Sequence, residues 1–540
     1  MRAFDNTGKT ETPGRESRAK ALVRHGVSLS LLTLVSRILG LLREMAKAAL
    51  MGTSALSDAF SVAFMIPNLF RRLFAEGSIA VAFIPTFKEY LLENDKEKTK
   101  DFLSCVLTFL TFFVSLAVCA GIIAAPLVIR LFGMEEYAET VLLTRLMFPF
   151  LAFISLAAFF QGILNSLRIF APSGLAPILL NIITIASAYG LSPFTANPAR
   201  AMAIGILTGG FLEAAIQFPF VMKHGLAVFF TGLKKAITNP GTKKILRLVG
   251  PTIVGMAAYQ LNDLVSTALA GNAGEGIVSS LQYSLRLQEL ILGIFAVSIG
   301  TVLLPDLAEH AKSGDWDIYN ARLIQAMNII ALITVPITFF SLARGENLIR
   351  LLFKTQSFNE DSVALTLAAF RFHIPGLYFI ALNRILAPAF YAQSNTKSPT
   401  LAGIISFASN IALAALLAGP FKGAGIAFAL SAASVVNTIL LIIFLGKNPR
   451  VNVGAALKPA LGYFFKMIVF SALAVTPVFL FGGRLDALFA GKSRIIAQGV
   501  PLAVWALAFS AIGTALLFIS GDKQLFSLLS LLRKKDRRTA

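Results

Sequence analysis

Charged residues are scarce in this sequence. Asp, Glu, Lys and Arg make up 14% of the 540 residues, whereas 56% are hydrophobic. A soluble globular domain is usually less than half apolar and about a quarter charged, so the composition excludes that class. Apolar blocks of roughly 18 to 30 residues recur along the whole chain, and a block of this length can cross a bilayer as a helix. The sequence therefore predicts an all-α integral membrane protein.

Cysteine and histidine are scarce as well. The two cysteines, Cys105 and Cys119, fall in one predicted helix, so we interpret them as small packing residues and not as a disulfide framework. The four histidines are scattered, and neither HExxH nor CxxC occurs, which leaves no zinc or nucleophile–base site. The fragment DALFAGKS at 486–493 lacks the first glycine of a Walker A loop. We expect no enzyme, no metal and no cofactor, and any work must draw on a coupling ion, the membrane potential or the substrate.

The distribution of basic residues predicts the orientation in the membrane. We predict 14 transmembrane helices, at residues 27–50, 57–87, 102–129, 146–167, 174–191, 201–221, 249–270, 277–308, 323–342, 362–391, 399–419, 424–446, 459–482 and 495–520. Of the lysines and arginines outside them, 29 fall on the side of the two termini and 10 on the other. Positive charge collects on the cytoplasmic side, so both termini should be cytoplasmic. The net charge of +20 then reports topology and contact with anionic membrane lipids, and we expect no nucleic-acid partner.

Features of the first half of the chain return in the second. FIPTFKEYL around Pro85 resembles LLPDLAEH around Pro305, and LLNIITIAS at Asn181 resembles ASNIALAA at Asn410. Because six helices return the chain to its starting side, the two copies should be parallel repeats about an axis along the membrane normal. The predicted organisation is a disordered basic leader (1–26), an N-lobe (27–223), a basic linker (224–248), a C-lobe (249–446), two extra helices (459–520) and a basic tail (521–540).

Nine basic residues lie inside the predicted helices, and five of them are in the first two. A buried arginine costs at least about 2.5 kcal/mol in a bilayer, so these side chains must face water, carboxylates or an anionic ligand. We expect Lys47 and Lys466 to reach an interface, and we leave structural pairing and function open for Arg371 and Arg384. The nine residues are Arg37, Arg43, Lys47, Arg71, Arg72, Arg286, Arg371, Arg384 and Lys466.

Carboxylates accompany the arginines, but there are too few to neutralise them. Arg37 and Glu44 fall on one helical face at a spacing of seven, and Arg72 and Glu76 are four apart on another. A structural salt bridge with Glu76 is one reading of the Arg71–Arg72 pair. The favoured hypothesis is a central cationic, water-filled cavity between the lobes that accepts an anionic substrate. Arginine suits this role because its planar group donates two parallel hydrogen bonds to phosphate.

These residues resemble a known family. The segments SRILGLLRE (36–44) and SDAFSVAFMIPNLFRRLFAEGSIAVAFIPTF (57–87) are similar to the amino-terminal signature of the MurJ/MviN lipid II flippases. This family belongs to the multidrug/oligosaccharidyl-lipid/polysaccharide exporter superfamily. LAPAFYAQSNTKSP at 386–399 extends the resemblance. Glu44 stands where relatives commonly carry an aspartate, and the leader has no counterpart that we recognise.

The resemblance implies a function and a site. The substrate would be lipid II, an undecaprenyl diphosphate carrying a disaccharide pentapeptide, moved from the cytoplasmic to the periplasmic leaflet of the bacterial inner membrane for peptidoglycan synthesis. Arg43, Arg286 and Glu44 would contact its diphosphate and sugar, and the two extra helices would form a groove for its lipid tail. The residues expected to line the site are Arg37, Arg43, Glu44, Asp58, Asn68, Arg71, Arg72, Glu76, Arg286 and Glu289.

Alternating access by rocking of the two lobes is the expected mechanism. An ion site near Asn262, Asp263 and Asn410 is one way to reset the carrier, and the membrane potential is another. Other exporters of the superfamily, for lipid-linked oligosaccharides or drugs, remain alternatives, as do a membrane glycosyltransferase and a non-transporting scaffold. An arginine-rich cavity argues against a cationic drug. Cell-wall synthesis proteins are conceivable partners, but nothing in the sequence indicates them.

Overall fold

The structure, a computed structural model, describes residues 15–73, 82–226, 228–451 and 453–526, and all its regular elements in these ranges are helices. The first half holds α1 (Arg15–Met51), α2 (Ala55–Arg71), α3 (Ile84–Leu92), α4 (Lys96–Arg130), α5 (Tyr137–Met147), α6 (Phe150–Ser166), α7 (Ala171–Gly190) and α8 (Pro198–Lys223). After the short α9 (Leu233–Thr238), the second half holds α10 (Pro240–Asn272), α11 (Ile277–Ser313), α12 (Trp316–Phe353), α13 (Glu360–His373), α14 (Leu377–Ala392) and α15 (Lys397–Leu445). The chain ends with α16 (Val453–Leu488) and α17 (Val500–Ile519). This confirms the all-α class.

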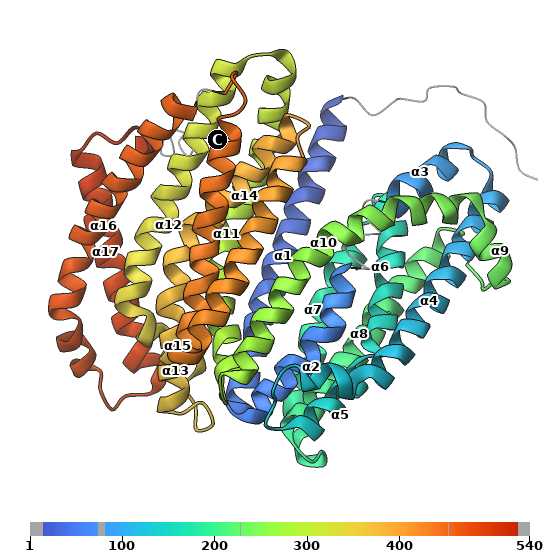
Figure 1. Cartoon of the computed structure of the whole chain (residues 1–540), viewed down its shortest axis with the longest axis horizontal. Helices are drawn as coiled ribbons and strands as arrows, with labels where there is room; N and C mark the ends of the chain where they lie inside the picture. The colour runs from blue at the N-terminus through green and yellow to red at the C-terminus, as the bar shows by residue number, and fades with distance from the viewer. Residues whose placement is uncertain (1–14, 74–81, 227, 452, 527–540) are drawn as a thin grey trace, which may run out of the picture.

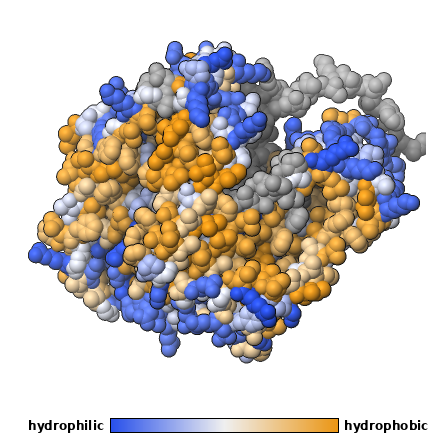
Figure 2. All heavy atoms as spheres, in the orientation of Figure 1, coloured by the Kyte–Doolittle hydropathy of each residue, from blue (hydrophilic) through white to orange (hydrophobic). Residues whose placement is uncertain are grey.

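The surface pattern fits a bilayer. Figure 2 shows a broad apolar band across the molecule, with hydrophilic residues gathered along its upper and lower edges. Within the described residues, nine helices are long and apolar enough to span a membrane. They include α15, whose two halves are continuous except for Lys422, where φ is +48°. The protein is therefore a multi-pass membrane protein, and the count of 14 spans stays a prediction.

Two sets of helices are arranged around α1 and α10 (Figure 1). In the first set, here called the N-lobe (α1–α8), α8 packs against α6 and α7, and α1 packs against α7. In the second, the C-lobe (α10–α15), α11 packs against α14 and α15 packs against α10, α13 and α14. Most of the buried hydrophobic residues form one cluster centred on α2, α4, α6 and α8 and another centred on α11–α14. The exact lobe boundaries stay a prediction.

The lobes draw together at one end of the molecule and spread apart at the other (Figure 1). We call the first the turn end, because it holds the turn between α1 and α2 at residues 52–54, and the other the loop end, which holds the α3–α4 connection at 93–95. Ser54 caps α2 by accepting a hydrogen bond from the Ser57 amide at 3.3 Å. A break at this position is expected, since serine is a favoured N-cap residue.

Helix extends into two segments that were predicted as leader and linker. Residues 15–26 were expected in a disordered leader, but α1 begins at Arg15, and the Arg-, Glu-, Lys- and Ala-rich run there consists of good helix formers. The linker was expected to extend to residue 248, but α10 begins at Pro240. Asn239 caps this helix by accepting hydrogen bonds from the Gly241 and Thr242 amides, and proline suits the first helical position.

The last two helices are fastened to α12. Arg344 on α12 donates two hydrogen bonds to the Asp486 carboxylate on α16, at 3.0 and 2.5 Å, and Asn347 donates to Gln498 beside α17 at 2.9 Å. In the first half of α16, Lys466 donates to Asp522, which follows α17, at 2.7 Å. That Lys466 reaches an interface stays a prediction. A carboxylate far along the chain neutralises this lysine, which the local sequence could not indicate.

Candidate functional site

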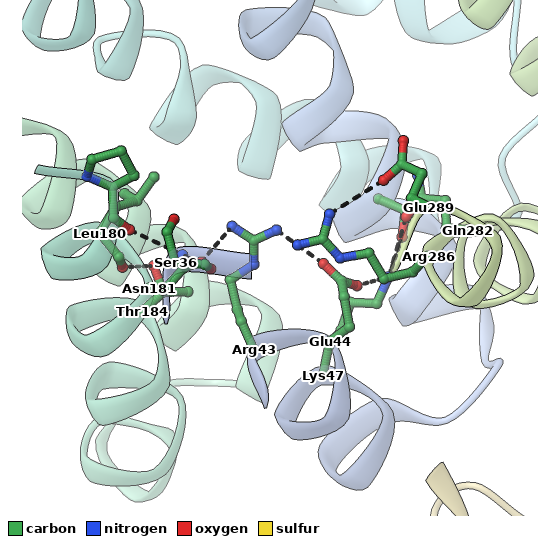
Figure 3. Close-up of polar contacts among 12 residues, drawn as sticks. Ser36, Arg43, Glu44, Lys47, Leu180, Asn181, Thr184, Gln282, Arg286 and Glu289 are labelled. Carbon is green, nitrogen blue, oxygen red and sulfur yellow. Dashed lines mark hydrogen bonds and ion pairs between the residues drawn. The ribbon is translucent and has the colours of Figure 1, made fainter. Parts of the chain in front are cut away.

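Arg43 lies on α1, where this helix packs against α7. Its guanidinium donates to the Asn181 side-chain oxygen at 3.2 Å and to Glu44 at 3.0 Å (Figure 3). The same group lies 5.6 Å from the centre of the Phe64 ring on α2, a cation–π distance. Asn181 in turn donates to the backbone oxygens of Ser36 and Pro177, which fixes the acceptor that Arg43 uses. Three N-lobe helices therefore hold this arginine in place.

Arg286 reaches the same place from the C-lobe. It comes from α11, and its guanidinium lies directly over Gly40 of α1: a Cβ at Gly40 would be 2.1 Å from Arg286 Nη2. Figure 3 shows the guanidinium groups of Arg43 and Arg286 pointing toward one another. Arg286 donates to Glu289 at 3.3 Å, but the Glu289 side chain is 58% exposed, so this pair is largely open to its surroundings. Two arginines from opposite lobes thus meet beside accessible space.

Lys47 lies one helical turn from Arg43 toward the turn end, and it is 2% exposed. Its ammonium group contacts Glu44 at 3.3 Å, Ser61 at 3.0 Å and Gln282 at 3.2 Å, and it lies 4.5 Å from the centre of the Tyr283 ring. The prediction that Lys47 reaches an interface is wrong, because both lobes enclose it. Its spacing of three from Glu44 was the sequence signal that could have predicted this pairing.

A second contact between the lobes lies at the end of α2. Arg72 donates to Asp263 on α10 at 3.3 Å, with the two side chains 35% and 46% exposed. The preceding residue, Arg71, donates through Nε to the side-chain oxygen of Asn68, one turn earlier on α2, at 2.8 Å. Arg71 and Arg72 therefore act differently: one is oriented by its own helix and the other reaches across. Glu76, the acid predicted to pair with them, lies outside the described residues.

Asp58 does not lie with the arginines. It is 4% exposed, and its two oxygens accept hydrogen bonds from the Gly276 and Ser279 amides, both at 2.7 Å. These are the free amides at the start of α11, where a carboxylate satisfies donors and the helix dipole together. The expectation that Asp58 lines the cavity fails for this conformation. Arg37, by contrast, is half-buried on α1, and the described part of the chain offers it no ion-pair partner.

The three residues of the predicted ion site are divided between two contacts. The Asn410 amide donates to Asn262 at 2.7 Å and to Ser266 at 3.0 Å, whereas Asp263 faces Arg72. Neighbouring residues on a helix point about 100° apart, which separates the carboxylate from the amides. Within the described residues, no group of three or more His, Cys, Asp or Glu side chains could hold a metal ion. In this conformation the three side chains are not brought to one point, and the ion site stays a prediction.

Polar contacts close the turn end between the lobes. The Thr53 hydroxyl in the α1–α2 turn lies 2.8 Å from that of Ser362 on α13, and Tyr283 donates to the Gly52 carbonyl at 3.0 Å. Gly52 has φ +56°, and a Cβ there would be 2.2 Å from the Ser357 carbonyl oxygen. Only glycine adopts this conformation without strain and leaves room for so close an approach. The lobes are therefore joined by these contacts at the turn end, and their helices spread apart toward the loop end.

This arrangement suits an anion. The guanidinium groups of Arg43 and Arg286 are each held on one side, by Asn181 and Glu44 and by Glu289, so their remaining donors are available to a diphosphate. Glu44 is within electrostatic range of Arg43, Lys47 and Arg286. Two carboxylates, Glu44 and Glu289, among these three cations still leave net positive charge between the lobes. Such a charge is costly inside a membrane unless an anion or water compensates it.

Comparison with known proteins identifies the family. The family model described as "Lipid II flippase MurJ" matches residues 47–494. The probable lipid II flippase MurJ of Treponema pallidum is 48% identical over 519 residues, which cover 95% of this chain and 98% of the relative. The corresponding protein of Haemophilus influenzae is 35% identical over 77% of this chain and 84% of its own length.

Solved structures agree on the fold. A structure of "Lipid II flippase MurJ, inward closed conformation" aligns with a TM-score of 0.74 over 91% of this chain and 99% of that one, at 24% identity. An inward-facing multidrug transporter of the MATE family aligns with a TM-score of 0.64 at 14% identity, over 80% of this chain and 96% of that one. The resemblance read from the amino-terminal helices is thus confirmed, and the chain belongs to the lipid II flippase MurJ family.

Proposed function

We propose that this protein moves lipid II across the bacterial inner membrane, binding the diphosphate and sugar head between the lobes while the lipid tail stays in the bilayer. The observation that carries the proposal is the meeting of Arg43 on α1 and Arg286 on α11, one from each lobe. Arginine pairs of this kind bind phosphate groups, and named relatives are lipid II flippases. Transport alone needs no covalent chemistry, so we infer that the protein is not an enzyme.

The loop end would face the cytoplasm. It collects the excess of lysine and arginine, in accordance with the positive-inside rule. In that orientation the spread lobes open toward the cytoplasmic leaflet, and the hydrogen bonds at Thr53, Asp58 and Tyr283 close the periplasmic side. Binding of an anion would draw Arg43 and Arg286 together, and the lobes would then rock to open the turn end.

Membrane potential is the energy source that the charge distribution favours. Cations that lack a full set of carboxylates feel about 2.3 kcal/mol per charge for every 100 mV that they cross. The bound diphosphate would neutralise them on the outward step, and the empty carrier would return with its positive charge drawn toward the negative cytoplasm. A drug exporter for cations is disfavoured, because the same positive charge would repel its substrate.

Complementation after depletion of the native flippase tests the proposal. Cells would carry wild type, Arg43→Ala or Arg286→Ala, and lipid II accessible at the outer leaflet would be measured. Losing one charge-assisted contact costs about 1.5–3 kcal/mol, so we expect outward movement to fall by roughly 10- to 100-fold in each variant. Arg145→Ala is the matched control, since among the described residues this arginine donates only to the backbone oxygen of Ile122 in the N-lobe.

Normal outward movement in both Arg43→Ala and Arg286→Ala, at equal expression, would contradict the proposed head-group site. Failure of the wild-type protein to restore accessible lipid II would contradict the function itself.

A further inference from the structure

The environment of Lys47 joins three helices from both lobes. An ammonium group has three hydrogens, and here three acceptors surround it: Glu44 on α1, Ser61 on α2 and Gln282 on α11. The ring of Tyr283, also on α11, covers it at 4.5 Å. Lys47 is therefore an N-lobe residue held partly by the C-lobe.

Glu44 links this lysine to the arginine site. One of its oxygens lies 3.0 Å from Arg43 and the other 3.3 Å from Lys47, so the carboxylate is shared between the two cations. Figure 3 shows the resulting line of contacts, which runs from Asn181 through Arg43, Glu44 and Lys47 to Gln282. It begins where the substrate anion would bind and ends on the opposite lobe.

A purely structural role for Lys47 does not explain why a charged residue stands in this chain of contacts. Replacing a buried ion pair with apolar side chains is often neutral or stabilising, so packing alone does not require a lysine here. Methionine would fill a similar volume beside Tyr283. What methionine could not do is respond to a change in the charge beside Glu44.

We propose that Lys47 is a positioning residue that transmits occupancy of the arginine site to the junction between the lobes. A diphosphate on Arg43 repels Glu44 and competes with it for the guanidinium. Glu44 then moves toward Lys47 and draws the ammonium away from Gln282 and Tyr283. The substrate thereby loosens the contact that must separate before the turn end opens. This inference rests on the proposed function.

The test measures lipid II binding and the distance between the lobes separately, in the full chain in nanodiscs. A background of Cys105→Ala and Cys119→Ala removes both native cysteines. Spin labels at Phe194→Cys and Phe421→Cys would then report the distance, since these side chains are 85% and 61% exposed on opposite lobes. Lipid II itself is the probe, and Lys88→Met, on the exposed face of α3, is the control.

In the otherwise unsubstituted chain and in Lys88→Met, lipid II should change the distance distribution. In Lys47→Met we expect lipid II to bind within about threefold of the unsubstituted chain but to leave the distribution unchanged. Gln282→Leu removes the C-lobe acceptor of Lys47 and leaves the lysine intact. It should likewise bind lipid II without a change in the distance distribution. Lys47→Arg keeps the donors and should restore the change.

A distance change of normal size in Lys47→Met or in Gln282→Leu would overturn the inference. If Lys47→Met does not fold, Gln282→Leu decides alone. If even the unsubstituted chain does not bind lipid II, the proposed function fails first and the inference falls with it. A failure of the inference alone leaves that binding intact.

Discussion

Arg286 extends from its own lobe to lie against the backbone of α1. This contact requires residue 40 to be glycine, since any Cβ would occupy the position of the guanidinium. Gly40 is buried at the centre of a long helix, where glycine is about 1 kcal/mol less favourable than alanine. The close approach of an arginine from the other lobe accounts for a residue that helix stability alone would disfavour.

Gly40→Ala tests this close approach. The new methyl group should displace the end of the flexible Arg286 side chain without disturbing the backbone, so we expect lipid II binding to weaken by about tenfold, the loss of one charge-assisted contact. The melting temperature should stay the same or rise, because alanine favours the helix. Binding and thermal unfolding would both be measured.

The control for this prediction is Gly403→Ala in α15, where an added Cβ meets nothing within 4 Å. It should raise stability slightly and leave binding unchanged. Unaltered binding in Gly40→Ala would mean that Arg286 does not need its place over α1.

For single residues, the sequence predicted which side chains lie at the site more accurately than it predicted which partners they contact. Arginine in apolar helices is conspicuous because lipid does not tolerate it, so Arg43 and Arg286 could be selected from the sequence. Their partners could not: Asn181 is 138 residues from Arg43, and Asp263 is 191 from Arg72. Lys47 was misread because a lone lysine with an apolar stem commonly reaches an interface.

At the scale of elements, the first turn of α11 in the C-lobe is capped by a side chain of the N-lobe. Asp58 on α2 satisfies the Gly276 and Ser279 amides, so the closed turn end and the capped α11 are one feature. Opening the turn end must leave both the carboxylate and the amides to water.

Asp58→Asn should weaken this closure. The amide retains one acceptor and loses the charge that favours a helix N-terminus, and caps of this kind contribute about 1–2 kcal/mol. We expect lower thermal stability and, in spin-label distance measurements, more of the population separated at the turn end. Asp361→Asn is the control, because this exposed acid in the first turn of α13 carries the same charge at a comparable position. Equal effects of the two substitutions would refute a specific role for Asp58.

A second element-scale prediction concerns α16. Asp486→Ala removes the partner of Arg344, which is 5% exposed, and leaves a buried charge without compensation. We expect a loss of about 3 kcal/mol in stability, measured by unfolding in detergent. Arg344→Met combined with Asp486→Ala should recover much of it. An additive loss in the double variant would show that the two groups act separately.

The approximate positions of the helices could be predicted from the sequence, because apolar blocks mark them. Their ends were less predictable: α10 starts at Pro240 because Asn239 and Pro240 form a helix start in a polar region that hydropathy reads as a linker. The parallel repeat predicts two lobes, but not which of their ends is closed, because that depends on contacts such as Thr53 with Ser362, 309 residues apart.

For the whole molecule, alternating access requires the turn end to open. In the background of Cys105→Ala and Cys119→Ala, Thr53→Cys with Ser362→Cys should form a disulfide, because the two hydroxyls lie 2.8 Å apart. The oxidised protein should lose flippase activity, and a reducing agent should restore it. Each single cysteine variant serves as a control. Full activity in the oxidised double variant would exclude separation of the lobes at this point.

The nature of that seal has a consequence for energetics. Its contacts are hydroxyls, amides and a carboxylate, and each exchanges for a hydrogen bond to water when it breaks. The net difference is about 0.5–1.5 kcal/mol for a neutral contact and about 1.5–3 kcal/mol for a contact to the carboxylate. An apolar interface of equal area would resist hydration, whereas these polar contacts can break in favour of water and form again. The carrier's preference for one side should accordingly respond to water activity, with excluded osmolytes such as sucrose shifting it toward the dry, shut form.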